Sequence, residues 1–181
     1  MPLDITPFTM TADEFVPEKL NFKVEFEPTK VEDKKYVING DTGEYIGVVG
    51  NSFNCASHGD FFEGIHNTIT EHLGEAECDN MNMHWRTARK NAWAMLDMRL
   101  PEVTAKIVTD KHETTIGQRI IALHGIDGSC SNQVFFGSID FFCTNGMIKG
   151  EHDKVRRKNT ANFNMDTFIR DLKRSVTDFY A

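Results

Sequence analysis

The residues with the clearest capacity for chemistry are cations that stand beside an aromatic ring. The segment 85–90 reads Trp-Arg-Thr-Ala-Arg-Lys, and the segment 154–158 carries four further cations. Proteins that bind single strands without sequence preference combine a cationic groove, which holds phosphates, with flat rings on which bases stack. The pattern predicts a single-stranded DNA-binding surface whose stacking ring and phosphate contacts are Trp85, Arg86, Arg89, Lys90, Arg119, Lys154, Arg156, Arg157 and Lys158.

The same residues have a plainer structural interpretation. Trp85 and Trp93 are both compatible with core positions, Trp93 more so than Trp85, and 154–158 is compatible with a solvated loop. The chain shows neither a zinc finger nor a recognition helix with a basic stripe, so no module that reads base edges is evident. Binding without sequence preference is therefore the favoured mode.

Catalytic and metal-binding motifs are incomplete in this sequence. Ser129 and Cys130 follow His124 closely, but the segment 127–131 lacks the second glycine of a Gly-x-Ser-x-Gly turn, which favours a hairpin with hydroxyl caps. The glycine-rich loops that cradle nucleotide phosphates are absent. Neighbouring cysteines and histidines form no second pair at zinc-ligand spacing: Cys55 and His58, His124 and Cys130, Cys143 and His152. We therefore predict a protein that is not an enzyme and holds no metal or cofactor.

Composition places the chain among ordinary globular proteins. Its 181 residues are 40% hydrophobic and 26% charged. The chain has no apolar run long enough to span a bilayer and no secretory signal, so we expect a cytoplasmic protein without membrane contact. The four cysteines show no Cys-x-x-Cys spacing and are expected to be reduced thiols.

Charge is distributed unevenly under a net charge of −7. Residues 1–81 carry 16 acidic and 5 basic side chains, whereas residues 82–181 carry 11 acidic and 15 basic side chains. An acidic chain of this kind can present a basic face, unless folding mixes the two parts.

The elements that must position these residues are those of an α+β protein. We expect an irregular acidic arm over 1–33, with one extended strand between Pro17 and Pro28, and a single α+β domain over 34–181. Two β-rich runs around Asn39–Gly43 predict a hairpin over 34–50. Ser57 as N-cap, Gly74 beyond the last apolar position, and apolar residues at helical spacing predict a helix between them: Phe62, Ile65, Ile69 and Leu73.

The second part of the chain predicts an antiparallel sheet that ends in a helix. Strands are expected over 85–100, ended by Pro101, and over 103–109, 116–124 and 134–142, with turns at 111–115 and 125–129. In the third of these strands, Ile120, Ala122 and His124 share one face. Paired phenylalanines give the last strand two apolar faces, as in the interior of a sheet. A final helix begins near Asn164, with one central helix before it, and its apolar face is formed by Phe168, Leu172, Val176 and Phe179.

Several of these segments together resemble a family of phage- and plasmid-borne proteins known as domain of unknown function 932. The resemblance covers roughly 34–180. It is carried by the run 35–50, the helix 60–65, the Asp127-Gly128-Ser129 turn, the segment 142–147, and Lys158-Asn159-Thr160, where Asn159 replaces a histidine common in the family. The resemblance implies a place in phage replication and recombination, among proteins that bind or anneal single-stranded DNA or help a phage RNA polymerase reach its promoter. It supplies no catalytic residues.

We therefore expect a phage single-stranded DNA-binding protein without sequence preference. It would act in DNA replication, recombination or early transcription in the infected bacterial host, as a homo-oligomer and with phage replication or transcription proteins as possible partners. The acidic segment 1–81 supports an alternative, a factor that contacts a phage or host polymerase or a defence protein. A further alternative is an enzyme that acts on nucleic acid through a Cys/His or metal centre.

Overall fold

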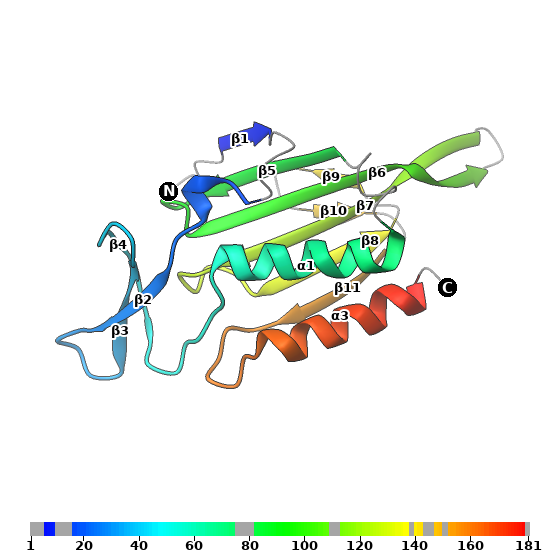
Figure 1. The fold of residues 1–181 in the computed structure, drawn as a ribbon. Helices are drawn as coiled ribbons and strands as arrows, with labels where there is room; N and C mark the ends of the chain where they lie inside the picture. Colours follow the sequence, from blue (N-terminus) through cyan, green and yellow to red (C-terminus); the bar gives the residue numbers. More distant parts are fainter. Residues whose placement is uncertain are drawn as a thin grey trace.

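A computed structural model describes residues 6–9, 16–74, 82–108, 113–137, 140–142, 147–149 and 152–179. Its largest element is an antiparallel sheet of six strands in the order β1-β5-β6-β7-β8-β11 (Figure 1). The strands are β1 (Thr6–Thr9), β5 (Asn82–Ala88), β6 (Trp93–Val108), β7 (Glu113–Gly125), β8 (Asn132–Gly137) and β11 (His152–Arg157). The far halves of β6 and β7 extend beyond the rest of the sheet (Figure 1).

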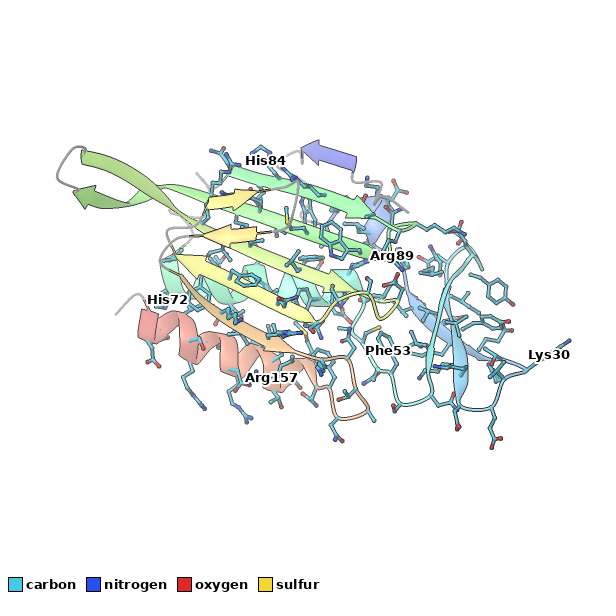
Figure 2. The ribbon with its side chains drawn as sticks, turned by 180° about the vertical axis from the view of Figure 1, so that it is seen from behind. Lys30, Phe53, His72, His84, Arg89 and Arg157 are labelled. Carbon is cyan, nitrogen blue, oxygen red and sulfur yellow. The ribbon has the colours of Figure 1, made fainter. Side chains whose placement is uncertain are left out.

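Two helices cover one face of this sheet, and a hairpin lies over the other. The helices are α1 (His58–Leu73) and α3 (Met165–Phe179), and the hairpin consists of β9 (Asp140–Phe142) and β10 (Met147–Lys149). Figures 1 and 2, which view the molecule from opposite sides, show the helices and the hairpin on opposite faces. The predicted α+β class, with an antiparallel sheet, a central helix and a C-terminal helix, is confirmed.

A smaller sheet stands at one end of the large one. It contains β2 (Val24–Pro28), β3 (Lys34–Asn39) and β4 (Tyr45–Gly50), and is preceded by the short 3-10 helix η1 (Glu18–Leu20). The predicted hairpin over 34–50 is confirmed as β3–β4. Phe22, Ala92 and Ile126 form a buried cluster between the smaller sheet and the end of the large sheet.

The central helix begins and ends where its capping residues predict. The Ser57 hydroxyl accepts a hydrogen bond from the Asp60 amide at 3.1 Å, and Gly74 closes the helix with a φ of 90°. In α3, the Asn164 side chain accepts from the Thr167 amide at 3.1 Å. Both helices bury their predicted apolar faces against the sheet: Phe62, Ile65 and Ile69 from α1, and Phe168, Leu172 and Val176 from α3. The side chain of Phe179 lies outside the described residues.

Alternation along the central strands gives the large sheet its two faces. Ile120, Ala122 and His124 of β7 point to the helices, as predicted, and Ile121 belongs to a separate cluster on the opposite face. In β8, Phe136 lies in the helix-facing core and Phe135 on the other face. The prediction of an interior strand with two apolar faces is therefore confirmed for β8.

The boundaries of several strands differ from the predictions. Residues 85–100 form two strands joined by a turn over 89–92, and the register of β6 against β7 shifts between Leu100 and Thr104. Pro101 therefore lies within β6 at an irregularity, a position where a proline costs no ladder hydrogen bond. The single strand predicted over 134–142 is divided into β8 and β9, which belong to different sheets.

The N-terminal arm and the basic segment 154–158 hold more structure than predicted. In the arm, β1 pairs with β5 and β2 pairs with β3, while the expected strand between Pro17 and Pro28 is confined to its second part. The segment 154–158 is not a loop, because residues 152–157 form β11 at the edge of the sheet. The predicted turn at 111–115 overlaps the start of β7, and residues 109–112, Cys78 and Cys143 lie outside the described residues.

Candidate nucleic-acid interface

The face of the large sheet that points away from the helices, called here the far face, collects the predicted cations from two distant segments. The strand register aligns five residues in one row across the sheet: Arg86, Met95, Leu123, Gln133 and Arg156. Paired residues of an antiparallel sheet project to the same side. Arg86 and Arg156 therefore lie on one face, about 19 Å apart over four strand spacings. Arg156 is on the edge strand β11, and Arg86 is on β5, which is bordered by β1. Lys154 lies beside Arg156 on the same face, paired with Phe135.

The centre of the far face is apolar. Met95, Ile121 and Phe135 form a buried cluster, with Trp93 and Leu123 partly exposed beside it. The β9–β10 hairpin lies over the far face (Figure 2). Among the described residues of this face, Trp93 is partly exposed and is joined to β5 by the turn over 89–92.

Trp85 does not belong to this surface, and its predicted role is wrong. Its side chain is fully buried beneath α1, with its ring 4.7 Å from that of Phe62 in an edge-to-face contact. A ring without accessible surface cannot receive a base. Trp93, which was favoured as a core residue, instead lies half-buried on the far face. The alternation of Ala94, Leu96 and Met98 is the signal that places Trp93 opposite them.

Arg119 lies on the far face, but its guanidinium is already paired with the Asp97 carboxylate. Its Nη2 donates to Asp97 Oδ2 at 2.7 Å and its Nε donates to Oδ1 at 3.2 Å, and its side chain is only 15% exposed. Arg99 lies 3.4 Å from the same carboxylate. A buried guanidinium that is paired with a carboxylate does not fit the predicted role of Arg119 as a phosphate contact. Arg99, which was not predicted, is half-exposed on the same face.

Arg157 also departs from the predicted set. It alternates with Arg156 along β11, so it points to the helix side, where its Nη2 donates to Asp171 Oδ2 of α3 at 2.8 Å. Figure 2 shows His84 and Arg157 toward opposite edges of the sheet. Lys158 follows the end of β11 and is exposed. Arg156 remains on the far face, where its Nε donates to the Ser131 hydroxyl at 3.2 Å.

The β5–β6 turn brings Arg89 and Lys90 to the end of the sheet that meets the smaller sheet (Figure 2). Arg89 Nε donates to Asp127 Oδ2 at 2.7 Å, and Lys90 is exposed. Burial alone would raise the pKa of Asp127, but hydrogen bonds from Ser129 and Arg89 outweigh it and hold that pKa below its usual value. The carboxylate thus stays ionised and fixes Arg89.

The candidate nucleophiles lie in unreactive surroundings. Burial raises the pKa of both the Cys55 and the Cys130 thiol to about 12, so neither is a thiolate near neutral pH. His124 is fully buried, and its Nδ1 is hydrogen-bonded to His58 Nδ1 at 2.8 Å. Ser129, Cys130 and His124 therefore do not form a nucleophile–base arrangement. Within the described ranges, no three histidine, cysteine or acidic side chains are grouped so that they could hold a metal ion.

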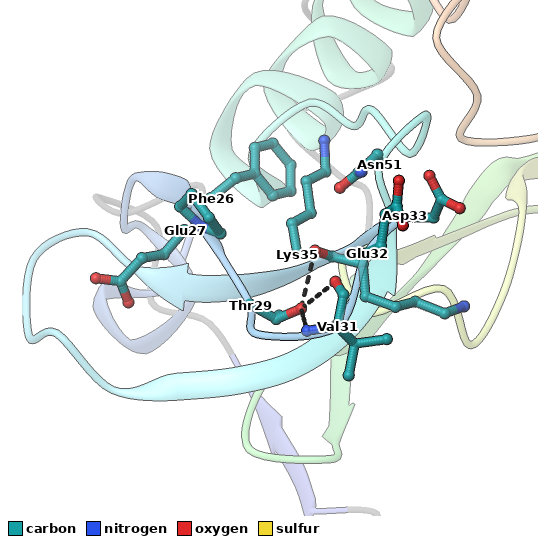
Figure 3. Close-up of a pocket in the computed structure, with 10 residues that line it drawn as sticks. Phe26, Glu27, Thr29, Val31, Glu32, Asp33, Lys35 and Asn51 are labelled. Atoms are coloured by element: carbon teal, nitrogen blue, oxygen red, sulfur yellow. Dashed lines mark hydrogen bonds between the residues drawn. The ribbon is translucent and has the colours of Figure 1, made fainter.

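A pocket of about 490 Å³ lies on the smaller sheet (Figure 3). Its lining includes Phe26, Val31, Lys35 and Asn51. The Lys35 ammonium donates to the Phe53 carbonyl at 2.7 Å and lies 4.0 Å from the centre of the Phe26 ring. The lining also contains Glu27, Glu32, Asp33 and Lys34, so the pocket combines apolar and charged side chains.

Three segments that carry the family resemblance meet at the end of the large sheet. A Cβ added to Gly47 would lie 3.3 Å from Asp127 Cβ, and one added to Gly128 would lie 3.6 Å from Val49. The Asn159 side chain donates to the Gly125 carbonyl at 3.0 Å and accepts from Asn132 at 2.6 Å. The β4 strand, the 127–129 turn and the 158–160 segment are therefore packed around the base of the β5–β6 turn.

The fold and this surface define an α+β protein built on one antiparallel sheet with two helices on one face. Residues 45–180 match the model of the family described as Domain of unknown function (DUF932), which covers most of the chain. The chain belongs to this family. No curated protein and no solved structure matches it. None of the helices that the structure describes is long and apolar enough to cross a bilayer.

Proposed function

We propose that this protein binds single-stranded DNA without sequence preference, through the far face and the β5–β6 turn. The observation that carries this proposal is the row that joins Arg86 and Arg156 across one sheet face, with Lys154 beside it and the Trp93 ring between the edges. The role is one of binding and not of catalysis. It is exercised as a homo-oligomer in phage DNA replication, recombination or early transcription, in the cytoplasm of the infected bacterium.

The arrangement matches the two kinds of group that a single strand exposes, phosphates and unpaired bases. Phosphates are met by the cations of β5 and β11, and each neutralised phosphate releases counterions, which makes the affinity dependent on salt. Bases are met by the partly exposed indole of Trp93, which accepts any base because every base has a flat face. Contacts to phosphates and to the flat faces of bases carry little sequence information.

The position of the hairpin sets the path of the strand. Because β9 and β10 lie over the far face, the strand has to use the part that contains Trp93 and leads to the β5–β6 turn (Figure 2). That path passes between Arg86 and Arg156 and reaches Lys90. These residues are therefore the principal contacts that we propose, and Trp85, Arg119 and Arg157 are omitted from them.

The experiment is fluorescence anisotropy with labelled oligonucleotides of identical length, as single-stranded DNA, duplex DNA and single-stranded RNA, over a salt series. We expect single-stranded DNA to bind more tightly than duplex, with little difference between homopolymers and mixed sequences, and affinity that falls as salt rises. Affinity that is flat across the salt series, or absent for single strands, contradicts the proposal.

A second function is favoured by the exposed face of the smaller sheet. Tyr45 and Val48 are 52% and 54% exposed, and the Tyr45 hydroxyl donates to Glu27 at 2.7 Å. An apolar surface beside acidic side chains suits a protein partner with a basic, apolar surface, such as a phage or host polymerase or a defence protein. A pull-down that survives nuclease treatment and is lost on Val48→Lys supports this function, and one that is lost with the nucleic acid contradicts it.

A further inference from the structure

The β5–β6 turn has an unusual backbone for the residues that form it. Arg89, Lys90 and Asn91 have φ values of 55°, 55° and 63°, so three successive residues other than glycine adopt the left-handed conformation. Side chains disfavour this conformation because the Cβ crowds the following carbonyl, and it persists only where the surroundings hold it. The turn that carries Arg89 and the proposed contact Lys90 is therefore held by other parts of the molecule.

Part of that support comes from the loop beyond β7. The Ile126 amide donates to the Ala92 carbonyl at 2.9 Å, and Asp127 holds the Arg89 side chain. These contacts secure the two ends of the turn. The carbonyl of Asn91, the last residue of the strained run, is held from inside the protein by His58 Nε2 at 2.7 Å.

The hydrogen bond to Asn91 requires one arrangement of protons in the buried histidine pair. A carbonyl only accepts, so His58 Nε2 carries the proton, and in the neutral ring Nδ1 is then an acceptor. The His124 Nδ1–H donates to that acceptor at 2.8 Å. His124 Nε2 is left without a proton, and it has no hydrogen-bond partner among the described residues. With both rings neutral, the chain from His124 through His58 to Asn91 is complete in this one arrangement.

The surroundings of the pair oppose a charge. His124 stacks on Phe61 at 4.4 Å, and His58 contacts the rings of Phe62 and Phe22 at 6.1 and 5.9 Å. Among the described residues, Asp127 of the 126–131 loop is the charged group that acts on the pKa of His58, and its own partner is Arg89. Burial lowers the pKa of His58 to about 4, and burial together with His58 lowers that of His124.

We infer that His58, supported by His124, is a positioning residue for the nucleic-acid surface: its hydrogen bond to Asn91 holds the strained turn that presents Arg89 and Lys90. This inference deepens the proposed function and rests on it, because the ligand of the turn is taken to be single-stranded DNA. The support that His58 gives to the turn can be tested without DNA. Loss of the donor at position 58 frees the turn while the sheet remains intact.

The experiment compares three variants of the full chain. His58→Met removes the donor to Asn91, His58→Gln keeps an N–H at a similar distance and does not titrate, and His72→Gln is the control on the exposed end of α1. The first measurement is the rate of tryptic cleavage after Arg89 and Lys90 without DNA. Cleavage follows the population of opened turn, so we expect a rise of about tenfold for His58→Met and no change for the other two.

The second measurement is single-stranded DNA affinity by anisotropy. We expect His58→Met to weaken binding about threefold to tenfold through a less ordered contact, with His58→Gln restored to the level of the native chain. Faster cleavage together with a native chain that binds no DNA supports the positioning role and contradicts the proposed function. A folded His58→Met chain that is cleaved at the native rate overturns the inference.

A folding failure of His58→Met still leaves the inference testable in the native chain. The tautomer of His58 and the solvent exchange of its ring proton are then measured by NMR at neutral pH, where the ring is neutral. The inference predicts a proton on His58 Nε2 that exchanges slowly with solvent, because it is held by the Asn91 carbonyl. A ring proton found on Nδ1, or one on Nε2 that exchanges freely, contradicts it.

Discussion

The two faces of the large sheet are built from the same strands and differ in almost every physical property. The face under the helices is closed, with Trp85, Leu96 and Phe136 fully buried. The far face has an apolar centre, a partly exposed Trp93, and cations on β5 and on the edge strand β11. Neighbours in sequence, such as Trp85 and Arg86, lie on opposite faces. The comparison shows that alternation along a strand, more than local composition, decides whether a side chain supports folding or binding.

The largest difference in stability between the two faces is expected when each tryptophan ring is removed in turn. Trp85→Ala leaves a cavity in the closed face and is expected to lower the free energy of unfolding by about 3–5 kcal/mol. Trp93→Ala should cost far less, because its ring is already partly in water. Urea denaturation followed by far-UV circular dichroism measures both. Equal losses for the two variants would mean that the faces do not differ in burial.

The pH dependence of stability tests the closed face, because that face buries the His58–His124 pair. The His58 pKa is about 4 in the folded chain and 6.5 when exposed, so below pH 6.5 the unfolded chain takes up a proton that the folded chain does not. Stability is therefore complete above about pH 7 and falls as the pH drops toward 4, by about 3 kcal/mol for this residue. Denaturation at a series of pH values measures the slope, which His58→Gln should reduce. An unchanged slope in that variant would assign the pH dependence to other groups.

The buried ion pair on the far face gives a third, smaller effect. Asp97→Asn removes the charged acceptor of Arg119, whose hydrogen bonds are expected to contribute about 2 kcal/mol to stability. The same change leaves an additional positive charge on the far face, so the folded variant should bind single-stranded DNA more tightly. Denaturation and anisotropy on the same preparation measure both effects. Weaker DNA binding by a stably folded variant would argue against contacts on this face.

The smallest effect is expected for the stacking ring. Trp93→Ala should weaken single-stranded DNA binding by about 1 kcal/mol, the lower part of the range for base stacking, because only part of the ring is exposed. Trp93→Phe keeps a flat ring and serves as the matched control. Quenching of tryptophan fluorescence on DNA binding, present in the native chain and lost in Trp93→Phe, gives a second measurement. Quenching that persists in both variants would indicate that the DNA does not reach this ring.

The sequence predicted the local elements well and the faces only in part. Ser57 and Gly74 mark α1 because capping depends on neighbouring residues, and alternation assigned Ile120 and Ile121 to opposite faces. The error at Trp85 has a specific cause. If 85–100 were one strand, Trp85 and Trp93 would share a face, but the chain turns back at 89–92 and pairs Trp85 with Leu96. That turn contains neither glycine nor proline, so no local signal marks it.

The contacts that remove Arg119 and Arg157 from the predicted site could not be derived from spacing. Asp97 and Asp171 are 22 and 14 residues away from the cations they hold, and only the pairing of β6 with β7 and the packing of α3 on β11 bring them together. The strand identity of 152–157 was missed for a related reason. Its polar, cationic composition is ordinary for an edge strand that discourages further pairing, and such a strand is difficult to separate from a loop.

The central claim is that phosphates contact the far face, and the salt dependence of binding tests it most directly. The logarithm of the association constant for single-stranded DNA is measured against the logarithm of salt concentration for the native chain, for Lys154→Gln/Arg156→Gln on the far face, and for Arg170→Gln/Arg174→Gln on exposed positions of α3. Both double variants remove two positive charges. The slope should become shallower by about 1.4 in the first variant, at about 0.7 for each lost phosphate contact, and remain near the native value in the second. Equal slopes for the two double variants would contradict the claim.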